Sequence, residues 1–242
     1  MTGIYRFADR NIAIYSTGSE IHKLCKDYLV GEKADFSVVI SQKDIETERF
    51  LSIREDEAQG ILPRSFSDGY LETLAVYRKI AEKMPEYDTI LFHGSAIAVD
   101  GAAYLFTAKS GMGKSTHTRL WREILGDRAV MINDDKPLIR VKDDGSAIAY
   151  GTPWDGKHRM SNNISVPLKS ICFLDRALDN EIREITKTEG YHMLIQQTYR
   201  PSDPDSLKRT LLLLDRMKVK LYRLCCNMEV SAAELSYNVM KG

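Results

Sequence analysis

Nine consecutive residues, at positions 108–116, have the types and spacing that bind a phosphate chain. They read AKSGMGKST and match the pattern G-x-x-x-x-G-K-[ST], except that Ala108 replaces the first glycine. The two glycines allow the backbone to bend so that successive amide N–H groups point at phosphate oxygens. Lys114 would reach the β and γ phosphates, and Ser115 would place its hydroxyl on Mg²⁺. The expected nucleotide-binding residues are Ser110, Gly111, Met112, Gly113, Lys114, Ser115 and Thr116.

The residues on either side of this segment predict a strand and a helix. The apolar run 102–107 is short enough for a buried strand, and a helical pattern extends from Ser115 to Leu125 before Gly126 ends it. A helix that begins at the lysine directs its free amides and its dipole toward bound phosphate. A glycine-rich turn before an ordinary helix is the alternative. The order of strand, loop and helix favours nucleotide binding, and Ala108 can replace glycine where φ is not positive.

Two adjacent carboxylates follow the next predicted strand, at residues 129–132. Asp134 and Asp135 come one helix and one strand after Lys114, so the strand end that carries them opens onto the same crevice as the loop. One carboxylate could order the metal, and the other could accept the proton of an attacking hydroxyl. An acidic turn ahead of Pro137 is the alternative. The phosphate loop upstream favours the catalytic interpretation.

A loop at residues 151–159, which reads GTPWDGKHR, concentrates cations and an aromatic residue after a predicted strand. Lys157 and Arg159 could neutralise the transferring phosphate oxygens, and Asp155 could bind metal or acceptor. Trp154 could exclude water from the site. The alternative is an exposed hairpin end with a packed tryptophan. The expected substrate-binding residues are Trp154, Asp155, Lys157, His158 and Arg159.

The order of these segments resembles the family of HPr kinase and phosphoenolpyruvate carboxykinase, in particular the C-terminal domain of HPr kinase/phosphorylase. Over about residues 88–190, the shared pieces are His93-Gly94 before the loop, the Ser-Gly-x-Gly-Lys-Ser segment and the Asp-Asp pair. The resemblance implies that Asp134 is the catalytic acid/base and that Asp135 binds metal or a histidine. It also implies that His93 tunes the two aspartates, although a lone histidine in a strand is more often a core residue. The expected catalytic residues are Asp134, His93, Lys114 and Arg159, and the expected metal ligands are Ser115 and Asp135.

The resemblance does not extend to the acceptor. Beyond residue 190 the chain does not match the elements with which HPr kinase docks its acceptor protein, and the motif of the reverse phosphorylase reaction is not recognised. Carboxykinases are about twice this length or more. A small subdomain ahead of the kinase core instead resembles stand-alone relatives that phosphorylate a serine or another hydroxyl.

Composition and charge limit the classes of partner. The 242 residues are 43% hydrophobic and 28% charged, which is ordinary for a globular protein. With 34 basic and 34 acidic residues there is no overall field to hold nucleic acid or an anionic membrane. The basic residues of 208–223 alternate with leucines and indicate the solvated face of a helix. Without a signal peptide or a long apolar run, we expect a cytoplasmic protein that needs neither membrane nor nucleic acid.

The fold class expected from these patterns is α/β with α+β character. Residues 1–85 predict a small strand-rich α+β subdomain that ends in a helix at 70–84, and residues 86–242 predict a P-loop kinase domain of the HPr kinase type with mixed sheets. Within the second domain we expect strands at 89–99 and 102–107 joined at Asp100-Gly101, and a hairpin of 138–142 with 147–150. Strands at 171–174 and 181–186 are expected to pair. Helices are expected at 190–199, 206–217 and 231–240, and a strand begins at Leu221.

Taken together, the sequence predicts an ATP-dependent, Mg²⁺-requiring phosphotransferase acting on an alcohol. A seryl hydroxyl of a peptide or protein is favoured slightly over a small metabolite as acceptor, and GTP or pyrophosphate remain alternative donors. Two other functions stay open: a regulator that uses nucleotide occupancy to switch a partner contact, and an NTPase in which water replaces the alcohol. Homo-oligomers are compatible with the sequence.

Overall fold

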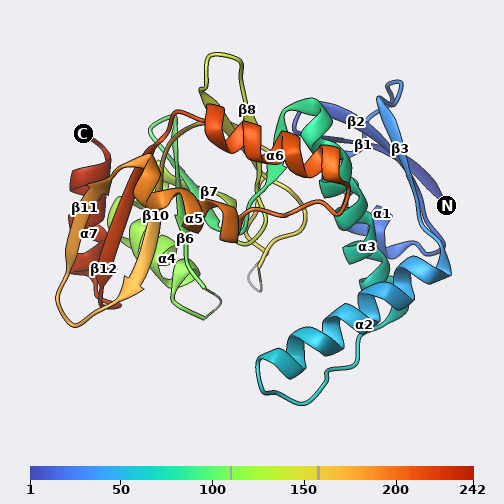
Figure 1. The fold of residues 1–242 in the computed structure, drawn as a ribbon, viewed down its shortest axis with the longest axis horizontal. Helices are drawn as coiled ribbons and strands as arrows, with labels where there is room; N and C mark the ends of the chain where they lie inside the picture. The colour runs from blue at the N-terminus through green and yellow to red at the C-terminus, as the bar shows by residue number, and fades with distance from the viewer. Residues whose placement is uncertain (110, 157–158) are drawn as a thin grey trace. The chain divides into compact units, whose positions relative to one another are not determined.

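The computed structural model describes residues 1–109, 111–156 and 159–242, and the chain divides into two compact units (Figure 1). The first unit is Met1–Lys83 and the second is Met84–Gly242. Both the phosphate loop and the aspartate pair belong to the second unit.

A three-stranded sheet and two long helices make up the first unit. Strands β1 (Thr2–Phe7) and β2 (Arg10–Tyr15) form an antiparallel hairpin, and β3 (Phe36–Val39) pairs parallel with β2. The short helices α1 (Glu20–Leu24) and η1 (Lys26–Tyr28) connect β2 to β3. The expected helix at 70–84 is α3 (Asp68–Lys83), which buries Leu71, Val76 and Ile80.

Helix α2 (Gln42–Ala58) lies in a subdomain for which the sequence predicted strands and a helix at 70–84, so this second long helix was not expected. A capping box begins the helix. The Ser41 side chain accepts from the backbone N–H of Asp44, and the Asp44 carboxylate accepts from the backbone N–H of Ser41. Nine of its 17 side chains are charged, and of its hydrophobic residues Ile45 is buried whereas Phe50 and Leu51 are exposed. The helical period therefore could not be recognised from apolar spacing.

The second unit contains a nine-stranded mixed sheet and four α-helices within the described residues. Its elements in chain order are η2 (Met84–Tyr87), β4 (Thr89–Leu91), β5 (Ser95–Val99), β6 (Ala102–Thr107), α4 (Lys114–Leu125), η3 (Gly126–Arg128), β7 (Ala129–Asn133), β8 (Leu138–Val141), β9 (Ala147–Tyr150), β10 (Ser165–Arg176), β11 (Glu181–Ile185), α5 (Lys187–Gln197), α6 (Pro204–Arg216), β12 (Lys220–Cys226) and α7 (Val230–Met240). The expected mixed sheets and α/β character are confirmed at this level.

Strand direction brings four carboxyl ends to one edge of the sheet. Strand β10 pairs parallel with β6 on one side and with β12 on the other. Strand β5 is antiparallel to both β6 and β7, so β7 runs in the same direction as β6. The segments that follow β6, β7, β10 and β12 therefore start at the same edge, which is where open α/β sheets bind ligands.

Two expectations about strands were wrong. The predicted strand 89–99 is interrupted: β4 pairs with β8, whereas β5 pairs with β6 and β7. The segment between them contains His93 and Gly94, and a Cβ on Gly94 would lie 2.7 Å from a Leu105 methyl carbon, so the crossover needs glycine. Strands β10 and β11 do not pair with each other, because β12, from much later in the chain, lies between them. The hairpins β5–β6 and β8–β9 are confirmed.

Helices cover both faces of the central strands. On β6, Ala103 and Leu105 pack into a core with Leu194 of α5 and with Leu213 and Leu214 of α6. The alternate residues Tyr104 and Phe106 pack on the other face, with Leu120 and Trp121 of α4 and with Ala232 and Ala233 of α7. Such strands read as continuous apolar runs because neither face meets water. Along the described ranges, no helix has both the length and the apolar character to cross a membrane.

His117 is fully enclosed between α4 and α7, on the side of α4 opposite the polar face discussed below. Its Nε2 lies 2.9 Å from Ser236 Oγ, which also accepts a hydrogen bond from Trp121 Nε1 and donates to the Ala233 carbonyl. A neutral His117 ring can therefore donate to or accept from this hydroxyl through Nε2, depending on its tautomer. Burial lowers the pKa of His117 to about 4, so the ring is neutral in the folded protein.

This burial predicts that acid destabilises the second unit. The unfolded chain binds a proton at His117 near pH 6.5, whereas the folded chain resists protonation down to about pH 4. The contribution of His117 to the free energy of unfolding is fully present above pH 6.5. It should decrease by about 3 kcal/mol as the pH is lowered to 4. Denaturant unfolding across this range measures the slope. In His117→Gln, which does not titrate, the slope should be reduced, whereas the exposed-site control His192→Gln should retain it. An unchanged slope in His117→Gln would contradict the assignment.

Candidate active site

The predicted phosphate loop connects the end of β6 to the start of α4. Strand β6 ends at Thr107 and α4 begins at Lys114, with Gly113 as the residue that precedes the helix. Gly111 and Gly113 have φ angles of 76° and 106°, a region that favours glycine. Ala108 is not among the residues with positive φ, as its side chain requires. Ser110 lies outside the described residues.

Lys114 is buried although it carries a charge. Only 9% of its surface is exposed, and its Nζ donates a hydrogen bond of 3.1 Å to the Ala108 carbonyl, back across the loop. Burial lowers the pKa of Lys114, and the carboxylates of Asp135 and Asp134 oppose that shift. The expected lysine and the expected aspartate pair thus share one electrostatic environment.

Asp134 is held by a short chain of hydroxyl groups. Its Oδ1 accepts a hydrogen bond of 2.6 Å from Ser95 at the start of β5, and Ser95 Oγ lies 2.9 Å from Thr118 Oγ1 on α4. Only 5% of Asp134 is exposed. The carboxylate is therefore oriented from β5 and α4 together, and Oδ1 is the oxygen so engaged.

Asn133 shapes the turn that carries the two aspartates. Its Oδ1 accepts from the backbone N–H groups of Asp135 and Lys136, at 2.9 and 2.6 Å, so the side chain closes the turn after β7. Its Nδ2 donates to the carbonyls of Thr152 and Trp154, at 3.0 and 3.2 Å. One buried amide therefore fixes the aspartate turn and the 151–156 loop to each other.

His93 lies beside Asp135 at the crossover between β4 and β5. Its Nε2 is 3.5 Å from Asp135 Oδ1, and its Nδ1 is 3.1 Å from Gln197 Oε1 at the end of α5. Burial is the main cause that lowers the pKa of His93, followed by the charge of Lys114, while Asp135 acts in the opposite direction. The pKa therefore lies below 6.5, and the imidazole is mostly neutral at pH 7.

The 151–156 loop crosses over Asp134. A Cβ on Gly156 would lie 3.0 Å from Asp134 Oδ2, so the glycine permits this close approach. Trp154 is buried, with 5% exposed, and Asp155 Oδ2 accepts hydrogen bonds from the backbone N–H and hydroxyl of Ser161. In these positions Trp154 and Asp155 stabilise the loop.

The expected cations follow this loop. Arg159 is exposed with a φ of 47°, and the expected residues Lys157 and His158 lie outside the described residues.

A cavity of about 80 Å³ connects the phosphate loop with the aspartate turn. Its lining includes Ser115 and Asp134 from the expected site, together with three residues that the sequence analysis did not select, Arg119, Arg122 and Met160. The two arginines follow Ser115 by four and seven positions on α4, so they lie on the same helical face. That spacing is a signal that the sequence contained.

A shallower cavity of about 10 Å³ lies on the other side of the phosphate loop. Its lining includes Met112 of the loop, Thr116 of α4, Arg176 at the end of β10, and Asn227 and Met228, which follow β12. Arg176 Nη2 donates a hydrogen bond of 2.6 Å to the Gly111 carbonyl. The loop thus has an acidic side and a side with Arg176.

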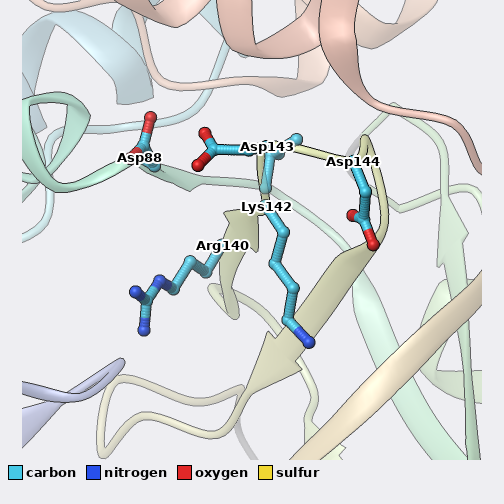
Figure 2. A pocket seen from close by; sticks show the side chains of 6 residues that line it. Asp88, Arg140, Lys142, Asp143 and Asp144 are labelled. Carbon is cyan, nitrogen blue, oxygen red and sulfur yellow. The ribbon is translucent and has the colours of Figure 1, made fainter.

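A wider cavity of about 420 Å³ occurs at the β8–β9 turn (Figure 2). Asp88, Arg140, Lys142, Asp143 and Asp144 line it, and none of these is an expected site residue. Asp88 and Asp143 both pair with Arg216 of α6, at 2.5 and 2.7 Å. In Figure 2 the Arg140 and Lys142 side chains extend away from the Asp143 carboxylate. Asp88 and Asp143 thus already have Arg216 as a cationic partner. These contacts do not indicate a ligand for this cavity.

These positions predict opposite responses of the His93 pKa to two substitutions. Lys114→Met removes a positive charge that disfavours the imidazolium, so the pKa of His93 should rise. Asp135→Asn removes a favourable negative charge, so the pKa should fall. Titration of the histidine ring signals by NMR measures both, with the exposed-site variant Asp179→Asn as the control. Shifts of the same sign, or none, would show that these three groups do not interact.

Comparison with known proteins gives a family and a similar solved structure. The structure of the Hpr(Ser) kinase/phosphatase from Coxiella burnetii is similar over 63% of this chain and 99% of that chain, at 10% sequence identity and a TM-score of 0.35. The resemblance to HPr kinase therefore stays a prediction from the sequence. No curated protein matches the sequence. A profile of the SynChlorMet cassette protein ScmC family matches residues 69–202, which is more than half of the 242 residues. The chain therefore belongs to the SynChlorMet cassette protein ScmC family.

Proposed function

We propose that the protein transfers the γ-phosphoryl group of ATP to an alcohol. The observation that supports this most directly is the grouping of buried Lys114 with Asp134 and Asp135 beside a strand–loop–helix segment. A buried lysine next to a bent, glycine-containing loop can hold a polyphosphate. The neighbouring carboxylates add what binding alone does not need, namely a proton acceptor.

In this proposal the donor and the base lie on the same side of the loop. The amides around Gly111 and Gly113 and the start of α4 would hold the phosphates, and Lys114 would exchange its Ala108 contact for phosphate oxygens. Asp134 would accept the proton of the attacking hydroxyl. Its Oδ2 faces the 151–156 loop, whereas Ser95 holds Oδ1. Enclosure on both sides would keep the carboxylate in position for a hydroxyl rather than for bulk water.

The residues present fit Mg²⁺ bound together with a nucleotide. The described ranges contain no cluster of three His, Cys, Asp or Glu side chains that could hold a metal. Mg²⁺ with ATP needs only one or two protein oxygens, because phosphates and water complete its shell. Ser115 and Asp135 would supply those oxygens, and the ion would neutralise charge on the phosphates. His93, neutral beside Asp135, would fix the orientation of that carboxylate.

The cations near the site would stabilise the transferred group. Arg159 follows the loop over Asp134, and its exposed side chain has room to approach a bound phosphate. Lys157 and His158 belong to the same proposed substrate-binding segment. Positive charge aimed at the oxygens of the transition state is the main way in which kinases accelerate phosphoryl transfer. A seryl hydroxyl of a peptide or protein is the preferred acceptor, and a small alcohol is the second.

An NTPase or a nucleotide-dependent regulator would share the phosphate loop but differ in turnover. Labelled ATP with Mg²⁺ and a mixture of serine peptides and small alcohols distinguishes the three functions. A kinase transfers label to an acceptor, an NTPase releases phosphate in its absence, and a regulator binds nucleotide and does neither. Binding without turnover under all conditions would exclude the proposed function.

Asp134→Asn should separate the base from the metal ligand. If Asp134 accepts the proton, turnover should fall by a factor on the order of 10² to 10⁴ while the affinity for Mg-ATP stays the same. Asp135→Asn should instead weaken binding of Mg-ATP relative to ATP without metal. Calorimetry and transfer rates measure both effects, with the exposed-site variant Asp179→Asn as the control. Loss of Mg-ATP affinity in Asp134→Asn would assign that residue to the metal.

A further inference from the structure

One face of α4 carries a polar stripe that leads away from the phosphate loop. Ser115, Thr118, Arg119 and Arg122 are spaced i, i+3, i+4 and i+7, and all four line the cavity of about 80 Å³ that also contains Asp134. The helix rises about 1.5 Å per residue, so the arginines lie roughly 6 and 10 Å along the axis from Ser115. The cavity is therefore bordered by the Asp134 carboxylate, and its α4 side carries two hydroxyls and two cations.

Arg122 has no charged partner within the described residues, and Arg119 has only an exposed one. Arg122 is half-buried, and its Nη1 donates to the sulfur of Met160 at 3.1 Å. No carboxylate in the described part of the chain forms an ion pair with Arg122. Arg119 pairs with Glu123 at 3.3 Å, but 61% and 55% of these two side chains are exposed, so the pair is weak. A half-buried guanidinium without a charged partner is unfavourable, and an anion that forms hydrogen bonds with it would offset this cost.

We propose that this cavity binds a carboxylate of the phosphate acceptor, and that the acceptor is an acidic peptide containing serine. The inference rests on the proposed function. A volume of about 80 Å³ can take a carboxylate group but not a whole metabolite. The arginines lie roughly 6 and 10 Å along α4 from Ser115, a span of about two or three residues of extended peptide, at about 3.3 Å each. The serine hydroxyl would lie at Asp134, which borders the same cavity.

The chemical step follows from this placement. The serine oxygen forms a bond to the γ phosphorus as the bond between that phosphorus and the β–γ bridging oxygen breaks, and ADP leaves with the electron pair. The serine proton passes to Asp134. The acidic side chain takes no part in the bond changes. It pairs with Arg122 and Arg119 and so fixes the hydroxyl in line with the donor.

Synthetic serine peptides with Glu, Gln or Lys two or three positions from the serine test the inference. Binding is measured by calorimetry with and without a non-hydrolysable Mg-ATP analogue, and transfer is measured with labelled ATP. The wild-type protein should bind the Glu peptide about tenfold or more tightly than the Gln peptide, because a charge-assisted pair is lost in the latter. In Arg122→Gln this ratio should approach one. Arg209→Gln, which removes an exposed cation of α6, should keep it.

Each other outcome has a definite meaning. Equal binding of Glu and Gln peptides by the wild-type protein, or an unchanged ratio in Arg122→Gln, would overturn the carboxylate site even if transfer occurs. Selective binding of the Glu peptide without any transfer would support the site and reject the kinase. Equal loss of transfer to all peptides in Arg122→Gln would assign Arg122 to the donor phosphates and overturn the inference. Glycerate, tested as a free hydroxy acid, distinguishes a small acceptor: its phosphorylation in place of the peptides would overturn the peptide assignment.

Discussion

Buried charge around Lys114 is the constraint on which the second unit depends. An ammonium group with 9% exposure is costly unless opposite charge or hydrogen-bond acceptors lie close to it. The Ala108 carbonyl and the carboxylates of Asp134 and Asp135 meet that need in the folded chain. A phosphate chain would meet it better, because it supplies several negative oxygens at once. The fold thus maintains a cationic centre whose protein partners are few and close by.

The strand order explains how these groups meet. Lys114 follows β6 and the aspartates follow β7, and β5 lies between them in the sheet. Strand β5 contributes Ser95, which orients Asp134, while the crossover before it contributes His93, which faces Asp135. Asn133 then ties the aspartate turn to the 151–156 loop. Each carboxylate is therefore supported by a different segment, and their roles can differ although they are adjacent in sequence.

The family match and the site coincide in the chain. Residues 69–202 include the phosphate loop, the aspartate pair, His93, the 151–156 loop and Gln197, which contacts His93. The three-stranded sheet of the first unit lies outside the matched range. The range that matches the family model therefore contains the segment that carries the proposed chemistry, including α4 with its arginines.

The sequence alone determined the local pieces, because they depend on short-range rules. Apolar runs predicted β6 and β7, Asp100-Gly101 predicted the β5–β6 turn, and the glycines before Lys114 predicted the bend before α4. Only the tertiary structure decided which strands are neighbours, since the insertion of β12 between β10 and β11 depends on packing of segments far apart in the chain. It also decided that Asp134 is enclosed by Ser95 and Gly156, and that the face of α4 with Arg119 and Arg122 borders the cavity that contains Asp134. Those relations join different elements, so no local pattern encodes them.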